Sequence, residues 1–421
     1  MLLNPSLTVK AESKLPKRAW LVVLLLSFVG CLNYLDRMMI TTMHESIVKE
    51  MPMTDGQFGL LTSVFLWVYG ILSPFTGFLA DRFSRSRVII LSLFVWSATT
   101  FLTAYSTSFE QLLATRVLMG ISESCYIPAA YALIVDYHKG PTRSFASGLH
   151  IAGIMSGQSF GFVGGWLAEE HKWNTSFIVF GILGVVYSLV LAFILRDPPK
   201  SGNLVAFESD GKVSFLSGIK DLFKRRAYIL VFIIWGLLGV SGWIISGWLP
   251  VFYQKQFNLS QTLAGLYATG YIYPASIVGV ILGGLWTDYW RRKYKYAQIS
   301  VPIIGLLISV PCVIFASNSG SLMVAITLFM IYGLVRMFTD ANIMPILCLA
   351  ADHRYRATGF GVMNLLACVV GGVGIYAGGL LQDRNINLSE IFAYGSLLML
   401  VCVVCLYLIK VNISKKPFPE D

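Results

Sequence analysis

The chain has 421 residues, of which 56% are hydrophobic and only 13% are charged, and its mean hydropathy is +0.69. Soluble domains hold about 45 to 50% apolar and about 25% charged residues, so this composition excludes a soluble protein and predicts an integral membrane protein. The net charge of +10 could suggest nucleic acid. We instead predict that it reflects attraction to anionic lipid headgroups and that nucleic acid is not a partner.

Twelve apolar runs of about 20 residues predict membrane-spanning helices. Their predicted ranges are 19–46, 57–80, 87–106, 109–136, 144–168, 174–195, 227–254, 262–289, 296–316, 321–350, 357–381 and 389–411. The sequence therefore predicts an all-α membrane protein with twelve transmembrane helices.

Basic residues predict the orientation of these helices. Of the 32 Lys and Arg residues, 25 fall in segments on one side of the predicted membrane. Because cytoplasmic loops carry the excess of positive charge, we predict that both termini are cytoplasmic. The predicted order is a cytoplasmic segment at 1–18, a six-helix bundle at 19–196, a cytoplasmic linker at 197–226, a second bundle at 227–411 and a tail at 412–421. Within the linker, the stretch from 214 to 226 predicts a short amphipathic surface helix.

Charged residues interrupt the first and fourth apolar runs. The first run contains Asp36 and Arg37, and the fourth contains Arg116 and Glu123. A charge near the bilayer centre costs at least about 2.5 to 3.5 kcal/mol, so such residues face the protein interior and mark a substrate, ion or proton pathway. The alternative is a permanent ion-pair network that joins the two helices, although buried pairs add little net stability.

Two loops repeat one pattern, in which a glycine and an aspartate at a helix end precede basic residues. Charge-assisted hydrogen bonds between such groups could hold one conformation and release in another, whereas the alternative is a topology signal alone. The residues predicted to form this latch are Gly77, Asp81, Arg82, Arg85, Arg87, Asp288, Arg291 and Arg292.

This loop pattern resembles that of the major facilitator superfamily over essentially the whole chain. The resemblance implies two six-helix bundles around a central cavity, which rock between inward-open and outward-open states. The charged runs resemble those of the anion-cation symporter group, which carries sugar acids and other organic anions with protons, and of the spinster group of lysolipid transporters.

For the anion symporters, the resemblance implies that Asp36 and Glu123 take up protons, that Arg37 contacts the substrate carboxylate and that Arg116 couples this site to the proton. Tyr69 matches a tyrosine that contacts substrate in the sugar-acid carriers. Burial raises the pKa of a carboxyl and a nearby arginine lowers it. Movement of an arginine onto an anionic substrate would therefore link proton binding to anion binding.

One position departs from the sugar-acid carriers, because Ile154 stands where they place a polar amide. Gln158 lies one turn further along and could substitute for it. In the tenth run, Arg336 is either a second anion anchor or a partner that Asp340 neutralises at the (i, i+4) spacing. We assign Asn33, Tyr34 and Asp340 to the shell that supports the site.

Aromatic and polar residues of the seventh and eighth runs could line a sugar-sized cavity or its outer gate. They are Trp243, Ser246, Trp248, Tyr253, Gln254, Tyr267, Tyr271 and Tyr273. Glycines of the fifth and eleventh runs are better explained by close helix packing.

Together these features predict a monomeric secondary transporter that takes up an organic anion, such as a sugar acid, with protons. The alternative is proton-coupled lysolipid transport. The sequence holds no HExxH, nucleophile elbow or P-loop, so we predict neither an enzyme nor a cofactor or metal site. The compact loops suggest a bacterial inner membrane, whose lipids would be the other partner.

Overall fold

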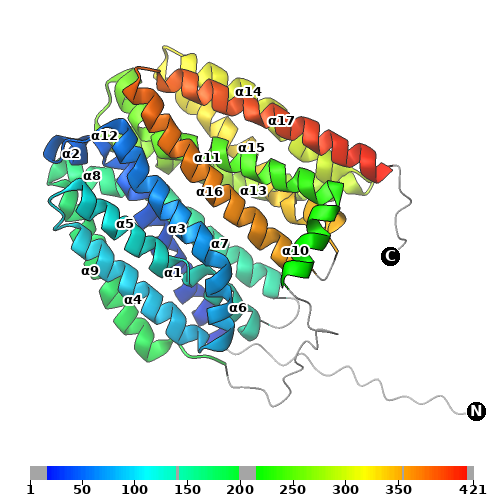
Figure 1. Cartoon of the computed structure of the whole chain (residues 1–421), viewed down its shortest axis with the longest axis horizontal. Coiled ribbons are helices and arrows are strands. Elements are labelled where there is room, and N and C mark those ends of the chain that lie inside the picture. The colour runs from blue at the N-terminus through cyan, green and yellow to red at the C-terminus, as the bar shows by residue number, and fades with distance from the viewer. Residues whose placement is uncertain (1–16, 139–141, 199–214, 353–354, 415–421) are drawn as a thin grey trace, which may run out of the picture.

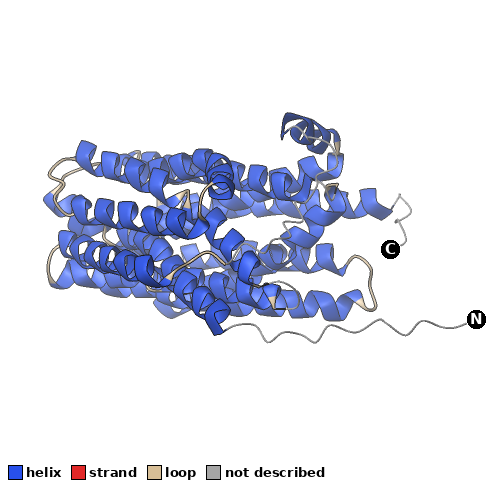
Figure 2. Ribbon diagram, turned by 90° about the horizontal axis from the view of Figure 1, so that it is seen from below, coloured by secondary structure: helices blue, strands red, loops and turns tan. Residues whose placement is uncertain are grey.

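The computed structural model describes residues 17–138, 142–198, 215–352 and 355–414. Within these ranges all regular structure is helical, and most helices run lengthwise through the molecule (Figure 2). This confirms the all-α prediction. Most of the predicted terminal segments and part of the linker lie outside the described residues, so the domain boundaries stay predictions.

The helices form two groups that follow the chain, with blue to green helices on one side and green to red helices on the other (Figure 1). The first group comprises α1 (Lys17–Thr42), α2 (His44–Glu50), α3 (Asp55–Arg82), α4 (Arg85–Thr103), α5 (Phe109–Glu123), α6 (Tyr126–Tyr137), α7 (Arg143–Ser159), α8 (Phe162–Glu170) and α9 (Trp173–Ile194). We call this group the N-terminal half.

The C-terminal half contains the remaining long helices. It comprises α11 (Arg226–Phe257), α12 (Gln261–Gly265), the π-helix η1 (Leu266–Tyr271), α13 (Ile272–Arg291), α14 (Ala297–Asn318), α15 (Leu322–Ala350), α16 (Arg356–Asp383) and α17 (Leu388–Ser414). In the chain, α10 (Phe215–Lys224) stands between the two halves, and it is the short helix that the amphipathic stretch predicts.

Eleven helices of the described residues are long and apolar enough to span a membrane. The predicted span at 144–168 is not among them, and it is divided at Phe160 and Gly161 into α7 and α8. At this break, the backbone N–H of Phe162 donates to Thr269 Oγ1 of the C-terminal half at 3.0 Å. The twelfth span therefore stays a prediction.

A second break explains where Glu123 lies. The predicted helix at 109–136 divides into α5 and α6 directly after this residue. Pro128 has no N–H to donate to the carbonyl of Ser124, four residues earlier. The hydroxyl of Thr76 donates to that carbonyl instead, at 2.7 Å. At this break, a hydrogen bond from Thr76 thus connects α3 to the end of α5 that carries Glu123.

Glycines allow α7 to pack closely against α1. A methyl group on Gly153 or Gly157 would overlap the backbone carbonyls of Ser27 and Cys31, respectively, whereas Gly148 faces open space. Such small residues let backbones approach in membrane bundles. The structural assignment of these glycines is confirmed for Gly153 and Gly157.

The two halves are joined at the end of the molecule that carries α2, α8 and α12 (Figure 1). There the Asp383 carboxylate accepts the backbone N–H groups of Asp55 and Gly56 at 2.9 and 3.0 Å. Lys255 Nζ also donates to Asp55 Oδ2 at 2.9 Å. A side chain of the C-terminal half therefore satisfies the exposed N–H groups at the start of α3.

Deeper in the molecule, α3 packs along α16. The Ser63 hydroxyl donates to the Gly372 carbonyl at 2.7 Å, and Trp67 Nε1 donates to the Val369 carbonyl at 2.9 Å. These contacts extend the junction between the halves toward the centre of the molecule.

Candidate functional site

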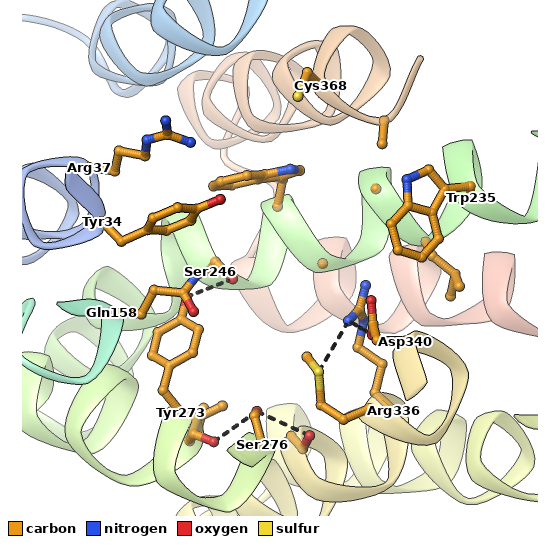
Figure 3. A pocket seen from close by; sticks show the side chains of 18 of the residues that line it. Tyr34, Arg37, Gln158, Trp235, Ser246, Tyr273, Ser276, Arg336, Asp340 and Cys368 are labelled. Atoms are coloured by element: carbon orange, nitrogen blue, oxygen red, sulfur yellow. Dashed lines mark hydrogen bonds and ion pairs between the residues drawn. The ribbon is translucent and has the colours of Figure 1, made fainter. Parts of the chain in front are cut away.

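A cavity of about 290 Å³ lies between the two halves. Figure 3 shows that Arg37 and Tyr34 enter from one side, while Arg336 and Asp340 lie at the other. Its lining residues are Tyr34, Arg37, Tyr69, Gln158, Trp235, Leu238, Gly239, Gly242, Trp243, Ser246, Ile272, Tyr273, Ser276, Tyr332, Gly333, Arg336, Met337, Asp340, Asn364, Ala367 and Cys368.

Arg37 of α1 is the buried cation of the N-terminal side. Its side chain is only 3% exposed, and its Nε donates to Glu123 Oε2 of α5 at 2.8 Å. The guanidinium carbon lies 4.5 Å from the ring centre of Tyr34 and 4.2 Å from that of Tyr69. Both rings therefore hold the cation at the cavity wall through cation–π contacts.

The Arg37–Glu123 pair leaves hydrogen-bonding capacity unused. Arg37 Nη2 and Glu123 Oε1 are buried, and neither has a partner among the described residues. Buried polar atoms are usually paired, so unpaired ones require an explanation such as a water, an ion or a ligand. An anionic group in the cavity would supply an acceptor for Arg37.

A second set of buried polar residues lies away from the cavity. Asp36, Arg116 and Asn33 are buried, and none of them lines the cavity. The Thr100 hydroxyl donates to Asp36 Oδ2 at 3.2 Å. Both polar atoms of the Asn33 amide, and Nε and Nη2 of Arg116, lack partners among the described residues.

Arg116 interacts electrostatically with both Asp36 and Glu123. It also lies 5.5 Å from the ring centre of Phe177, measured from its guanidinium carbon. The helical spacing of seven residues between Arg116 and Glu123 accordingly places them in one charged network. This position suits the predicted coupling role of Arg116 better than direct contact with a substrate.

Arg336 and Asp340 form the ionic pair of the C-terminal side. Arg336 Nη1 donates to Asp340 Oδ2 at 2.5 Å within α15, and the Asp340 side chain is 25% exposed. Arg336 Nε is buried without a partner among the described residues. Asp340 therefore neutralises Arg336, as one interpretation expected. The unpaired Nε also leaves Arg336 a donor for an anion, as the other interpretation requires.

Polar groups between these two pairs complete the cavity wall. The Tyr273 hydroxyl donates to Ser246 Oγ at 3.3 Å and also lies 3.3 Å from the sulfur of Met38. Gln158 lies beside Tyr34 and Tyr273 (Figure 3). The amide predicted to replace the missing one at Ile154 is thus within the cavity.

Some of the aromatic and polar residues that the seventh and eighth apolar runs offered for the cavity do line it. Trp243, Ser246 and Tyr273 line the cavity as expected. Trp248 donates from Nε1 to the Ile375 carbonyl at 3.0 Å, and its ring lies against His44 and Phe58 of the N-terminal half, so it lies at the junction of the halves and the outer-gate alternative stays a prediction for it. Tyr253 is buried in the hydrophobic core. The remaining residues of that set do not line the cavity, namely Gln254, Tyr267 and Tyr271.

Other cavity residues were missed from the sequence. Gly239 and Gly242 make part of the wall by exposing backbone, and Asn364 and Cys368 come from α16. The glycines carry no chemical signal, while Asn364 is the single amide within a long apolar run and could have been found on that basis.

The predicted latch residues do not pair with each other among the described side chains. Arg85 forms an ion pair with Asp136, while Asp288, Arg291 and Arg292 are exposed. Gly77 and Asp81 lie in the last turns of α3, in a stretch whose side chains are outside the described part of the structure. The latch role therefore stays a prediction.

Among the described residues, no group of three or more His, Cys, Asp or Glu side chains could hold a metal ion. The chemistry of the cavity is instead that of two guanidinium groups, a few hydroxyl and amide groups, and aromatic faces. Such a site can bind a polar anion and exchange protons at neighbouring carboxyls.

A helical membrane protein with a polar cavity between two halves has the architecture of a secondary transporter. A family model described as Major Facilitator Superfamily matches residues 26–375. The chain belongs to this superfamily, whose members similar to it are transporters and not enzymes.

Two curated relatives represent the two groups that the sequence resembles. "Protein spinster homolog 3" of Danio rerio is 28% identical over 75% of this chain and 67% of its own length. "Probable galactarate/D-glucarate transporter GudP" of Bacillus subtilis is 27% identical over 75% of each chain. The similarity to both groups is thus confirmed, and it does not discriminate between them.

A solved structure confirms the fold. The crystal structure of a bacterial homolog to the human lysosomal transporter spinster, in an inward-facing and unoccupied conformation, superposes with a TM-score of 0.77. The match covers 97% of this chain and 100% of that chain, with 21% sequence identity. At this identity, the likeness concerns the fold alone.

Proposed function

We propose that this chain is a proton-coupled symporter that takes up an organic anion, such as a sugar acid, by alternating access. The observation that supports this most strongly is Arg37, a buried cation that lines the cavity, pairs with the buried Glu123 and retains an unpaired donor. One residue is thus placed to contact both a substrate anion and a carboxyl that can hold a proton.

In the proposed cycle, the substrate carboxylate accepts hydrogen bonds from Arg37, with Tyr69 and Gln158 beside it. The anion then competes with Glu123 for the positive charge of Arg37, so protonation of Glu123 becomes more favourable when substrate is bound. Because such coupling is reciprocal, protonation of Glu123 also favours anion binding. Arg116 and Asp36 would extend this proton linkage away from the cavity.

Arg336 would provide the second anion contact, from the C-terminal half. An anion held by Arg37 and Arg336 together would bridge the two halves, which supports closure around the substrate. The junction at Asp55, Lys255 and Asp383 lies on the external side of the predicted topology. In this proposal, that junction opens when the latch on the opposite side forms.

Two carboxyls allow two protons to accompany one monovalent anion, which would move one net positive charge inward. Such import gains about 2.3 kcal/mol per 100 mV of membrane potential. We propose that the protein works as a monomer in a bacterial inner membrane. Uptake that does not respond to potential at fixed pH would contradict the electrogenic part of the proposal.

Lysolipid transport is the second candidate. The similarity to spinster proteins supports it, as do the apolar cavity residues Trp235, Leu238 and Met337, which could contact an acyl chain. The two arginines that line the cavity, Arg37 and Arg336, favour the anion, because a small carboxylate can use both cations whereas an acyl chain uses neither.

The test uses the full-length protein in liposomes with an internal pH dye. Sugar acids and other carboxylates are added outside one at a time, followed by lysolipids, and protein-free liposomes serve as the control. Substrate-dependent acidification with a carboxylate is the expected result. Lysolipid transfer without a proton response to any carboxylate would overturn the anion proposal in favour of the second candidate.

A further inference from the structure

A second hollow lies on the outside of the N-terminal half, between the start of α4 and the end of α9. Its volume is about 560 Å³, and it is separate from the central cavity. The two helices pack side by side and run in opposite directions (Figure 1). The first turns of α4 therefore lie beside the last turns of α9.

Each side of the groove carries an arginine at one end and apolar side chains further in. On α4, Arg87 is followed by Leu91 and Phe94, at spacings of four and three residues that keep them on one face. On the other side, Leu189 lies on α9, and Arg196 follows two residues after the end of this helix at Ile194. The groove is thus basic at one end and apolar further in.

The apolar part of the groove faces outward. Leu91 is 64% exposed, Phe94 is 42% exposed and Leu189 is 53% exposed. In a membrane protein, such residues meet lipid chains. The basic end lies at the predicted cytoplasmic surface, where anionic headgroups attract Lys and Arg.

Asp197 also lines the groove, but hydrogen bonds within the protein occupy its carboxylate. Ser84 Oγ donates to Asp197 Oδ2 at 2.5 Å, and the Ser86 backbone N–H donates to Asp197 Oδ1 at 2.8 Å. Neither Arg87 nor Arg196 forms an ion pair with another described residue. Two guanidinium groups therefore remain for an external anion.

We propose that this groove binds an anionic phospholipid of the cytoplasmic leaflet. Arg87 and Arg196 contact its phosphate, and an acyl chain lies along Leu91, Phe94 and Leu189. The positive charge of the two arginines favours a phosphate, since a guanidinium group can donate two parallel hydrogen bonds to phosphate oxygens. The exposed side chains of Leu91, Phe94 and Leu189 favour a lipid over free phosphate, because phosphate alone has no acyl chain to contact them.

The test is lipid retention by the detergent-purified full chain, measured by native mass spectrometry with added phosphatidylglycerol. We expect Arg87→Gln/Arg196→Gln to weaken retention by about tenfold, since both headgroup contacts are lost. The matched control is Lys220→Gln/Lys224→Gln on α10, which removes the same charge from exposed positions outside the groove. This control should retain lipid as the unmodified protein does.

A third variant keeps the test decisive if the glutamine pair fails to fold. Arg87→Lys/Arg196→Lys preserves the charge and should bind phosphatidylglycerol more tightly than phosphatidylcholine. Equal lipid loss from the α10 control and the groove variant would overturn the proposal in favour of unspecific headgroup attraction. Displacement of the lipid by inorganic phosphate alone would overturn it in favour of a phosphate site.

Discussion

The two arginine–carboxylate pairs at the cavity are built differently. Arg37 and Glu123 come from separate helices, α1 and α5, and Glu123 is completely buried. Arg336 and Asp340 lie one turn apart on α15, and Asp340 is partly exposed to the cavity. The first pair connects helices and adjoins a larger charged network, whereas the second is self-contained.

This difference suggests a division of roles. A carboxyl that is removed from the cavity can change protonation without contacting substrate, which suits Glu123 for coupling. A carboxyl at the cavity wall competes with substrate for its arginine, which suits Asp340 for tuning affinity. The following variants test this division.

Arg37→Ala should have the largest effect. It removes the cavity-facing cation and leaves Glu123 buried without its partner. We expect substrate affinity to fall at least about a hundredfold, because hydrogen bonds to charged groups contribute about 1.5 to 3 kcal/mol each. Isothermal titration with the carboxylate found in the liposome assay measures this. Unchanged affinity would assign Arg37 to structure alone.

Gly157→Ala tests whether the N-terminal half depends on close packing of α7 against α1. The added methyl group would overlap the Cys31 carbonyl, so we expect a loss of about 2 kcal/mol of stability. Gly148→Ala on the same helix is the control, because its added methyl group meets open space. Thermal unfolding in detergent should separate the two variants, and equal melting temperatures would contradict close packing.

Arg336→Ala should weaken substrate binding by about tenfold, because it removes one charged donor that Asp340 already partly neutralises. Its effect should therefore be smaller than that of Arg37→Ala in the same titration. If Arg336→Ala proves the more damaging of the two, the proposed order of the two anchors is wrong.

Asp340→Asn should have the smallest effect and the opposite sign. Without its carboxylate partner, Arg336 is freer to contact an anion, so affinity should rise a few-fold. Proton-coupled accumulation should persist, because this variant leaves Glu123 intact. Loss of coupling in Asp340→Asn would move the coupling role to the C-terminal half.

The positions of the helices could be predicted from the sequence because long apolar runs and membrane thickness set their extent. Local breaks were missed, since hydropathy does not register the loss of one hydrogen bond. Pro128 carried a usable signal for the break after Glu123, whereas at the break near Phe160 the N–H of Phe162 donates to Thr269, which lies far away in the chain.

The charged residues of the site could also be found from sequence, because buried charge is costly and therefore conspicuous. Their separation into cavity and network could not. Asp36 and Arg37 are adjacent in the chain, yet only Arg37 lines the cavity, since successive residues of a helix point in different directions. That Gly239 and Gly242 line the cavity could not be predicted either, because it depends on tertiary packing.

Proton coupling through Glu123 is tested by comparing Glu123→Gln with the unmodified protein in two assays on the same preparation, one for substrate binding and one for accumulation. The amide keeps the shape of the side chain but cannot exchange a proton. We expect Glu123→Gln to bind the carboxylate substrate but not to accumulate it in liposomes under an inward pH gradient. Accumulation equal to that of the unmodified protein would show that Glu123 does not couple proton and substrate movement.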